Sequence, residues 1–307
     1  MTDIVLRREV SRTRRPGWRW AALVLLLAVL AGAVAAGRAL LRRAGAAPAA
    51  SPGGPAAEGS TAGLPPPPAY EPDPALAALA AAETAQAAGD LAGARTNAFQ
   101  ALDIARDPAI RARIEDLLGR VHVAMVFSPH PMEEKQDYVV VEGDSIGRIA
   151  RAMGTTDAAL RRGNGIRGSL IRPGDRFRVL TGRFAIDIDK SANDLLLKLN
   201  DRFFKRYRVG TGQYGRTPAG EYRIVDKIAE PPWTRPEDGR ILPFGDTNNV
   251  LGTRWLKLDV AGYGIHGTWE PETIGRSSSA GCVRLLNADV EELFDLVPHG
   301  TPVRIVE

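Results

Sequence analysis

Two short segments near the end of the chain carry residues suited to nucleophilic catalysis. They are residues 263–268 (YGIHGT) and 277–285 (SSSAGCVRL), and they contain His266 and Cys282, the only cysteine among 307 residues. A thiol with an ordinary pKa of about 8.5 is mostly protonated at neutral pH, and a neighbouring imidazole can take its proton and hold the thiolate as an ion pair. His266 is therefore the candidate base for Cys282.

The residues around Cys282 suggest how a substrate would be held. Gly281 lets a carbonyl approach the backbone closely, and the N–H groups of Gly281 and Cys282 are candidates for an oxyanion hole. If residues 282–284 run as a strand, Arg284 shares a face with Cys282, where a guanidinium can hold a carboxylate bidentately. One cysteine with His266 gives too few ligands for a structural zinc site, so we expect no metal and no cofactor. The remaining histidines, His122, His130 and His299, lack such a setting.

From about Phe184 the sequence pattern predicts β-strands. These strands must position His266 and Cys282. Alternating or apolar runs at 184–188, 195–199, 207–209 and 255–258 are separated by glycine and proline. One helix is predicted at 288–297, with Asn287 as its N-cap, acidic residues in its first turns and Pro298 after its end. We expect a mostly antiparallel β domain here.

With these segments in place, residues 184–307 resemble an L,D-transpeptidase catalytic domain of the YkuD type. The matching pieces are TPAGEY at 217–222, IHGT at 265–268, and SAGCVRL at 279–285 followed by Asn287 and Asp289. The resemblance implies a β-sandwich in which Cys282 is the nucleophile, His266 is the base and the Gly267 carbonyl orients the imidazole. The substrate or oxyanion site that it implies comprises Ser279, Gly281, Arg284 and Tyr263.

The implied reaction is ping-pong acyl transfer between peptidoglycan peptide stems, which forms a 3→3 cross-link through a thioester on Cys282. One departure from the family is Ala280, where His is common. Because nucleophile, base, glycine and arginine are all retained, we expect activity to survive; Ala280 leaves open whether substrate contacts or oxyanion geometry differ. The alternatives are L,D-carboxypeptidase activity, attachment of D-amino acids or a protein to the stem, and a catalytically silent wall-binding anchor.

Residues 137–180 predict a β-α-α-β unit. A strand at 138–141 leads to a turn, a helix at 146–153 ended by Gly154, a second helix capped by Thr156, and a closing strand. The runs YVVVEGDSIGRIARAMGTTDAAL, GNGI and LIRPGDRFRV resemble a LysM domain, which implies binding to glycan that contains N-acetylglucosamine. We expect Asp144, Ser145 and Asn164 to face the sugar, and their alternative role is as cap and turn residues.

Residues 74–130 predict two or three packed helices, with Gly89 and Asp90 at a break. The alanine-rich pairs and the turn resemble one tetratricopeptide-type (TPR-like) hairpin. A helical spacer is the simpler interpretation, and a module that binds a protein partner is the alternative.

Residues 1–43 hold nine arginines and two acidic residues, so the positive net charge of +4 comes from this segment. The remainder is slightly acidic, which argues against nucleic acid as a partner. The apolar run within 18–41 is close to the roughly twenty residues that span a bilayer, and the arginines before it place the N-terminus in the cytoplasm. We expect a single-pass anchor in the inner membrane, a Pro/Ala-rich linker at 44–73, and the catalytic domain in the periplasm or cell-wall space. A secreted protein with a cleaved signal is the alternative.

The sequence therefore predicts a multidomain α+β protein. In chain order it has an N-terminal transmembrane helix, a helical segment, a LysM module and a C-terminal, mostly β, L,D-transpeptidase sandwich.

Overall fold

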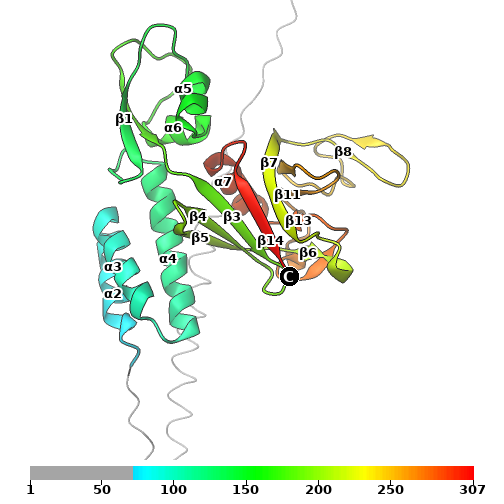
Figure 1. Cartoon of the computed structure of the whole chain (residues 1–307), viewed down its shortest axis with the longest axis horizontal. Coiled ribbons are helices and arrows are strands. Elements are labelled where there is room, and N and C mark those ends of the chain that lie inside the picture. Colours follow the sequence, from blue (N-terminus) through cyan, green and yellow to red (C-terminus); the bar gives the residue numbers. More distant parts are fainter. Residues whose placement is uncertain (1–71) are drawn as a thin grey trace, which may run out of the picture. The chain divides into compact units, whose positions relative to one another are not determined.

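A computed structural model describes residues 72–307 (Figure 1). The predicted membrane helix at 18–41 and almost all of the linker lie outside the described residues. Within 72–307, no helix has the length and apolar character needed to cross a bilayer.

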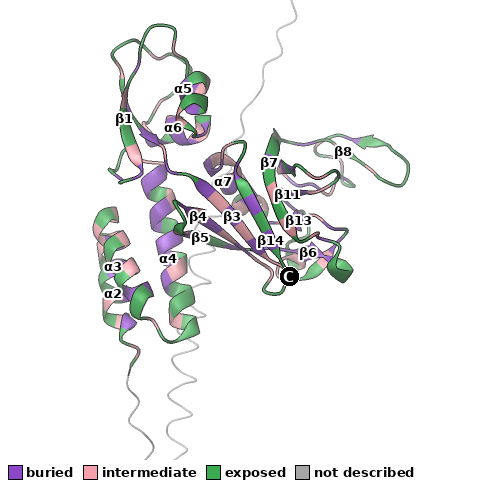
Figure 2. Cartoon of the chain, in the orientation of Figure 1, coloured by how far each residue is buried: buried purple, intermediate pink, exposed green. Residues whose placement is uncertain are grey.

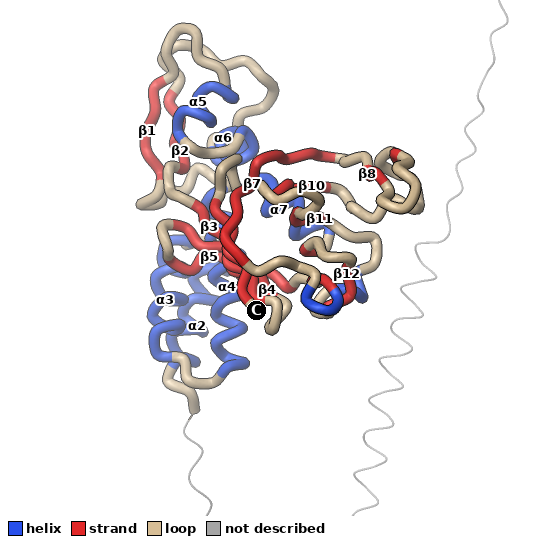
Figure 3. Tube along the Cα trace, turned by 45° about the vertical axis from the view of Figure 1, so that its right-hand side comes forward, coloured by secondary structure: helices blue, strands red, loops and turns tan. Residues whose placement is uncertain are grey.

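Three helices open the described part of the chain and lie beside one another (Figures 1 and 3). Asp90 caps the second by accepting a hydrogen bond from the Gly93 amide at 2.9 Å, and Asp107 caps the third, which begins at Pro108. Fully buried alanines, among them Ala82 and Ala94, let the first two helices approach closely. The bounds are α2 (Ala75–Ala87), α3 (Leu91–Ile104) and α4 (Pro108–Val126).

The LysM segment has the predicted β-α-α-β order, which is thereby confirmed. Its elements are β1 (Lys135–Val139), α5 (Ile146–Met153), α6 (Asp157–Gly163) and β2 (Arg176–Leu180). β1 and β2 pair antiparallel. The expected caps form: the Ser145 and Thr156 side chains accept from amides of the first turns of α5 and α6, and Gly154 ends α5 at a φ of +70°.

The C-terminal domain is the predicted mostly β sandwich. Eight strands follow the order β13-β11-β10-β7-β14-β3-β4-β5, and Figure 1 shows the two halves on either side of β14. The long strand β7 joins the halves, because its first part pairs with β14 and its second part pairs with β10. The eight strands are β3 (Phe184–Asp189), β4 (Asp194–Leu199), β5 (Arg202–Arg208), β7 (Gly220–Ala229), β10 (Arg254–Leu258), β11 (Gly264–His266), β13 (Val283–Arg284) and β14 (Pro302–Val306).

Shorter elements complete the domain. They are β6 (Thr211–Gly212), β8 (Trp233–Thr234), β9 (Ile241–Leu242), β12 (Ser277–Ser279), the short helices η1 (Gln213–Gly215) and η2 (Pro271–Thr273), and α7 (Asn287–Leu296). The prediction that Asn287 caps α7 is wrong. Leu286 occupies the cap position, and the Asn287 Oδ1 instead accepts a hydrogen bond from the Thr253 amide at 3.1 Å. The side chain therefore connects the start of α7 to the segment before β10.

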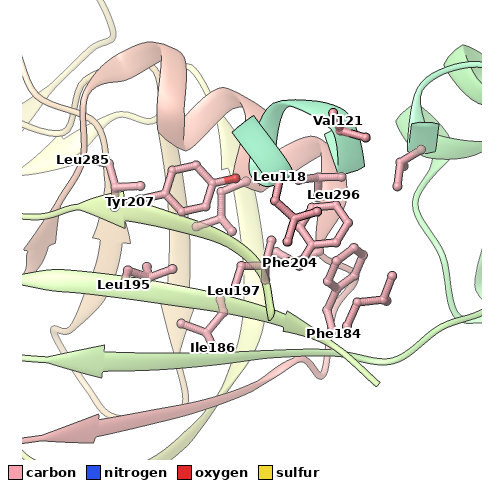
Figure 4. Packing of buried hydrophobic residues seen from close by; sticks show 14 of the residues in the cluster. Leu118, Val121, Phe184, Ile186, Leu195, Leu197, Phe204, Tyr207, Leu285 and Leu296 are labelled. Atoms are coloured by element: carbon pink, nitrogen blue, oxygen red, sulfur yellow. The ribbon is translucent and has the colours of Figure 1, made fainter. Parts of the chain in front are cut away.

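Helix α4 and the sandwich share one hydrophobic core (Figure 4). Leu118 and Val121 of α4 lie near Phe204 of β5, whose ring meets Phe184 edge-on at 5.2 Å between ring centroids. The other side of the Phe204 ring stacks on His122 of α4 at 5.0 Å. Figure 2 shows buried positions along both α4 and β3. The helical segment is therefore packed into the catalytic domain.

Replacing Phe204 by alanine is expected to lower the free energy of unfolding by about 3–5 kcal/mol, because it removes a ring that is 1% exposed and leaves a cavity between α4 and the sheet. Denaturant unfolding measures this change. Phe203→Ala is the matched control, since that ring is only half-buried and its removal should cost clearly less. Equal losses for the two variants would contradict the packing described.

Candidate active site

Strands β11 and β13 bring the predicted catalytic side chains to one face of the sheet. The two strands are parallel, and the register sets Ile265 opposite Val283 and His266 opposite Arg284. Because successive side chains of a strand alternate between faces, His266 and Arg284 lie on the same face. Cys282 immediately precedes β13, and its thiol is near enough to Arg284 for that charge to lower the thiol pKa. Ile265 and Val283 point to the other face, where both are at most 1% exposed. The buried face thus anchors the strands that present the polar face.

The imidazole of His266 is buried and held in one orientation. Its Nδ1 lies 2.6 Å from the Gly267 carbonyl oxygen, and only 3% of the residue is exposed. Donation from Nδ1–H to this carbonyl leaves Nε2 with the lone pair. Burial lowers the pKa of His266 to about 4; the carbonyls of Gly267 and Leu251 oppose this shift and the Arg284 charge adds to it. At neutral pH the ring is therefore an uncharged base.

The thiol of Cys282 is also held in its uncharged form. Burial raises its pKa, while the Gly264 backbone and the Arg284 charge lower it by less. The Sγ atom donates to the Gly262 carbonyl at 3.5 Å. The resting ion pair that the sequence suggested is disfavoured here, because burial penalises both the thiolate and the imidazolium. Both groups are therefore uncharged at rest.

Ser279 closes the turn that leads to Cys282. Its hydroxyl accepts a hydrogen bond from the Gly281 amide at 3.1 Å and donates to the Cys282 carbonyl at 2.7 Å, and the residue is 3% exposed. The Gly281 N–H is therefore not free to bind an oxyanion, contrary to the expectation from the sequence. The Cys282 N–H has no acceptor among residues 72–307 and is the open donor of the turn.

Tyr263 and Gly281 are in direct contact across the site. Gly281 has a φ of +146°, and a Cβ added to it would lie 2.8 Å from Cε1 of the Tyr263 ring. Only glycine fits this position. The Tyr263 ring thus forms one wall of the turn, beside the exposed Ala280.

Comparison with known proteins identifies the family of the domain that holds these residues. A family model described as the L,D-transpeptidase catalytic domain (YkuD) matches residues 183–305, and a LysM domain model matches residues 138–179. The Bacillus subtilis L,D-transpeptidase-family protein YkuD is 34% identical over 178 residues, which cover 97% of that protein and 55% of this chain. The chain belongs to the L,D-transpeptidase family.

Two further relatives extend the comparison. The Bacillus licheniformis protein of the same name is 36% identical to this L,D-transpeptidase-family chain over 177 residues, or 97% of its own length and 55% of this chain. Among solved structures, the catalytic domain of the Enterococcus faecium L,D-transpeptidase is 24% identical, with a TM-score of 0.34; the match covers 40% of this chain and 96% of that domain.

In this member of the L,D-transpeptidase family, Thr217 supports the turn before Cys282, and the sequence did not single it out as a site residue. Its buried hydroxyl donates to the Gly281 carbonyl at 2.7 Å and accepts from the Gly212 amide at 2.8 Å. The sequence feature that could have pointed to Thr217 is its position as the first residue of the TPAGEY segment. Since its partners lie 5 and 64 residues away along the chain, only the fold brings them together.

Replacing Thr217 by valine is expected to destabilise the fold by about 1–3 kcal/mol and to slow acylation, because two buried backbone groups lose their partner. Thermal unfolding and the rate of acyl-enzyme formation measure the two effects. Thr217→Ser keeps the hydroxyl and should retain most of both properties. A Thr217→Val variant as stable and as fast as the serine variant would contradict this role.

Trp255 is a second neighbour of the site that the sequence did not flag. It lies opposite His266 in the β10–β11 register, with ring centroids 5.7 Å apart and planes inclined by 33°. Its indole also covers Gly264, where an added Cβ would lie 2.7 Å from Cη2. The indole thus forms an apolar wall beside the imidazole. The alternating pattern at 255–258 could have predicted that the Trp255 side chain points away from the core, on the face opposite to Leu256.

The side chains expected to face the glycan lie in the LysM segment, outside the catalytic face, and make local hydrogen bonds. Asp144 accepts from the Val141 amide at 2.9 Å and from the Tyr138 hydroxyl at 2.8 Å. The Asn164 amide joins the end of α6 to β2, because it donates to carbonyls of Leu160 and Arg178 and accepts from the Arg178 amide. With the Ser145 cap, these contacts give all three side chains the structural role of caps and turn residues.

Within the described residues 72–307, no group of three or more His, Cys, Asp or Glu side chains is placed to hold a metal ion.

Proposed function

We propose that this protein is a peptidoglycan L,D-transpeptidase that uses Cys282 as nucleophile and His266 as base to form 3→3 cross-links. The observation that carries the proposal is the register of β11 and β13, which sets His266 opposite Arg284, two residues after Cys282. The Arg284 charge acts on both the imidazole and the thiol, so the three groups are neighbours of one guanidinium. Family membership and the accompanying LysM domain support peptidoglycan as the substrate.

The first half-reaction forms a thioester. The Cys282 sulfur attacks the carbonyl of the third stem residue as Nε2 of His266 takes the thiol proton. The carbonyl electrons move onto oxygen, where the Cys282 N–H is positioned to donate a hydrogen bond. The bond to the terminal D-alanine then breaks, and the imidazolium returns the proton to the departing amine. The neutral resting state of both groups is compatible with this concerted transfer.

The second half-reaction transfers the acyl group. The amine of an acceptor stem attacks the thioester carbon, a C–N bond forms and the C–S bond breaks. His266 takes a proton from the amine and returns it to the leaving thiolate, which restores the enzyme. No cofactor takes part in this scheme.

We further propose that the chain acts at the outer side of the inner membrane. The span predicted at 18–41 would tether it, and the LysM module would bind glycan that contains N-acetylglucosamine. Tether and glycan affinity together would raise the local concentration of the active site at its polymer. At about 3.1 Å per residue, an extended linker of some thirty residues reaches roughly 90 Å.

Product analysis tests the reaction. Purified full-length protein is incubated with a disaccharide tetrapeptide, and the products are separated and weighed by mass spectrometry. The proposal predicts a cross-linked dimer together with free D-alanine, both absent with Cys282→Ala. A tripeptide without dimer would identify an L,D-carboxypeptidase. Unchanged substrate from folded protein would favour the silent wall-binding anchor.

A further inference from the structure

The guanidinium beside the base already has a carboxylate partner. Arg284 Nη1 lies 3.0 Å from Glu270 Oε2, with 14% of the arginine side chain and 58% of the glutamate side chain exposed. Because Arg284 stands opposite His266 in the strand register, this ion pair borders the catalytic face. A site built only to take a substrate carboxylate would not need an anion beside its arginine.

The loop after β11 fixes the Glu270 backbone. The Glu270 amide donates to the Thr268 hydroxyl at 3.0 Å, and the Thr273 hydroxyl donates to the Glu270 carbonyl at 2.6 Å. Thr268 is itself buried, at 5% exposure. The backbone that carries the Glu270 carboxylate is therefore held in place by two hydrogen bonds.

The two charged groups retain capacity for a ligand. Of the two terminal nitrogens of Arg284, Nη1 is engaged by Glu270 and Nη2 donates to no group among residues 72–307. Glu270 uses one oxygen on Arg284 and is otherwise largely exposed. A purely anionic ligand would be repelled by Glu270, and a bare amine would leave Arg284 without a new partner. A group that carries an amine and a carboxylate on one carbon complements both.

We infer that Glu270 and Arg284 together form the site for the acceptor's head group, which is an α-amino-acid group. The inference rests on the proposed function. The acceptor carboxylate accepts hydrogen bonds from Arg284, and an N–H of its amine donates to Glu270. This orients the nitrogen lone pair toward the thioester on Cys282. As the C–N bond forms and the C–S bond breaks, a proton of the amine passes to His266 and then to the thiolate sulfur.

Glycine and glycinamide are suitable probes, because they share the amine and differ in the carboxylate. Full-length wild type, Glu270→Gln and Glu272→Gln are first acylated by a tetrapeptide stem and followed by intact mass. The concentration dependence of resolution by each probe is then measured. Glu272 is the matched control, since it is an exposed glutamate of the same loop and makes no ion pair within the described residues. Thermal unfolding verifies that each variant is folded.

Glu270→Gln is expected to raise KM for both probes by roughly five- to tenfold, because a charge-assisted hydrogen bond to the amine becomes a neutral one. KM is measured on the acyl-enzyme once it has formed, so the comparison does not depend on the acylation rate, and Glu272→Gln should match wild type in all properties. If Glu270 only shields Arg284 from anions, Glu270→Gln will have a lower KM for glycine and an unchanged KM for glycinamide. That result would overturn the inference. An unchanged KM for glycine in an acylated variant would overturn it too, with the proposed function intact. Absence of acylation in the wild type would contradict both the proposed function and this inference.

Discussion

Full-length protein carrying Cys282→Ala is expected to form no cross-linked dimer and to lose at least about 10⁴-fold in kcat/KM. Cys282 is the only cysteine among the 307 residues, so no other thiol can carry the acyl group. Release of D-alanine and appearance of dimer, each followed over hours, measure the loss.

The control for this variant is its folding. The Cys282 side chain is only half-buried, and its one hydrogen bond, to the Gly262 carbonyl, is long. We therefore expect the unfolding midpoint of Cys282→Ala to stay close to that of wild type. Dimer formation by the folded variant at more than a small fraction of the wild-type rate would exclude Cys282 as the nucleophile.

Replacing His266 by glutamine is expected to lower kcat/KM by about 10²- to 10⁴-fold, because general-base assistance is lost while the thiol remains. Burial holds the thiol pKa above its ordinary value, so little spontaneous thiolate exists to compensate. Acyl-enzyme formation under single-turnover conditions isolates this step. A variant that acylates at the wild-type rate would show that another group takes the proton.

The pH profile provides an independent check on His266. Since burial lowers the pKa of His266 to about 4, the base is uncharged and active above that value and becomes protonated as pH falls through it. Acylation by wild type should therefore persist at pH 5.5 and decline near pH 4. Decline centred near the ordinary histidine pKa of about 6.5 would contradict the burial of the ring.

Local features of the molecule could be predicted from sequence. Each cap or stop of the LysM helices depends on a few consecutive residues, so Ser145, Thr156 and Gly154 could be assigned without knowledge of the fold. The pairing of nucleophile and base was accessible for a related reason. His266 and Cys282 each sit in a short segment whose residue types already define the chemistry.

Features that depend on distant partners could not be predicted in this way. Asn287 suits an N-cap, yet its side chain bonds to Thr253, 34 residues earlier. The Gly281 amide suits an oxyanion hole, but the Ser279 hydroxyl occupies it in the folded turn. Likewise, nothing in the periodicity of α4 indicates that His122 would stack on Phe204, 82 residues away. In each case the deciding contact is set by tertiary packing.

Intact-mass spectrometry of the full-length protein with a carbapenem tests the account most directly. The β-lactam carbonyl offers the thiol an acyl group that is released slowly, so the adduct can be weighed. The account predicts one added carbapenem per chain in wild type and none in Cys282→Ala, with peptide mapping to the segment that contains residue 282. An adduct that persists in Cys282→Ala, or none in folded wild type, would contradict it.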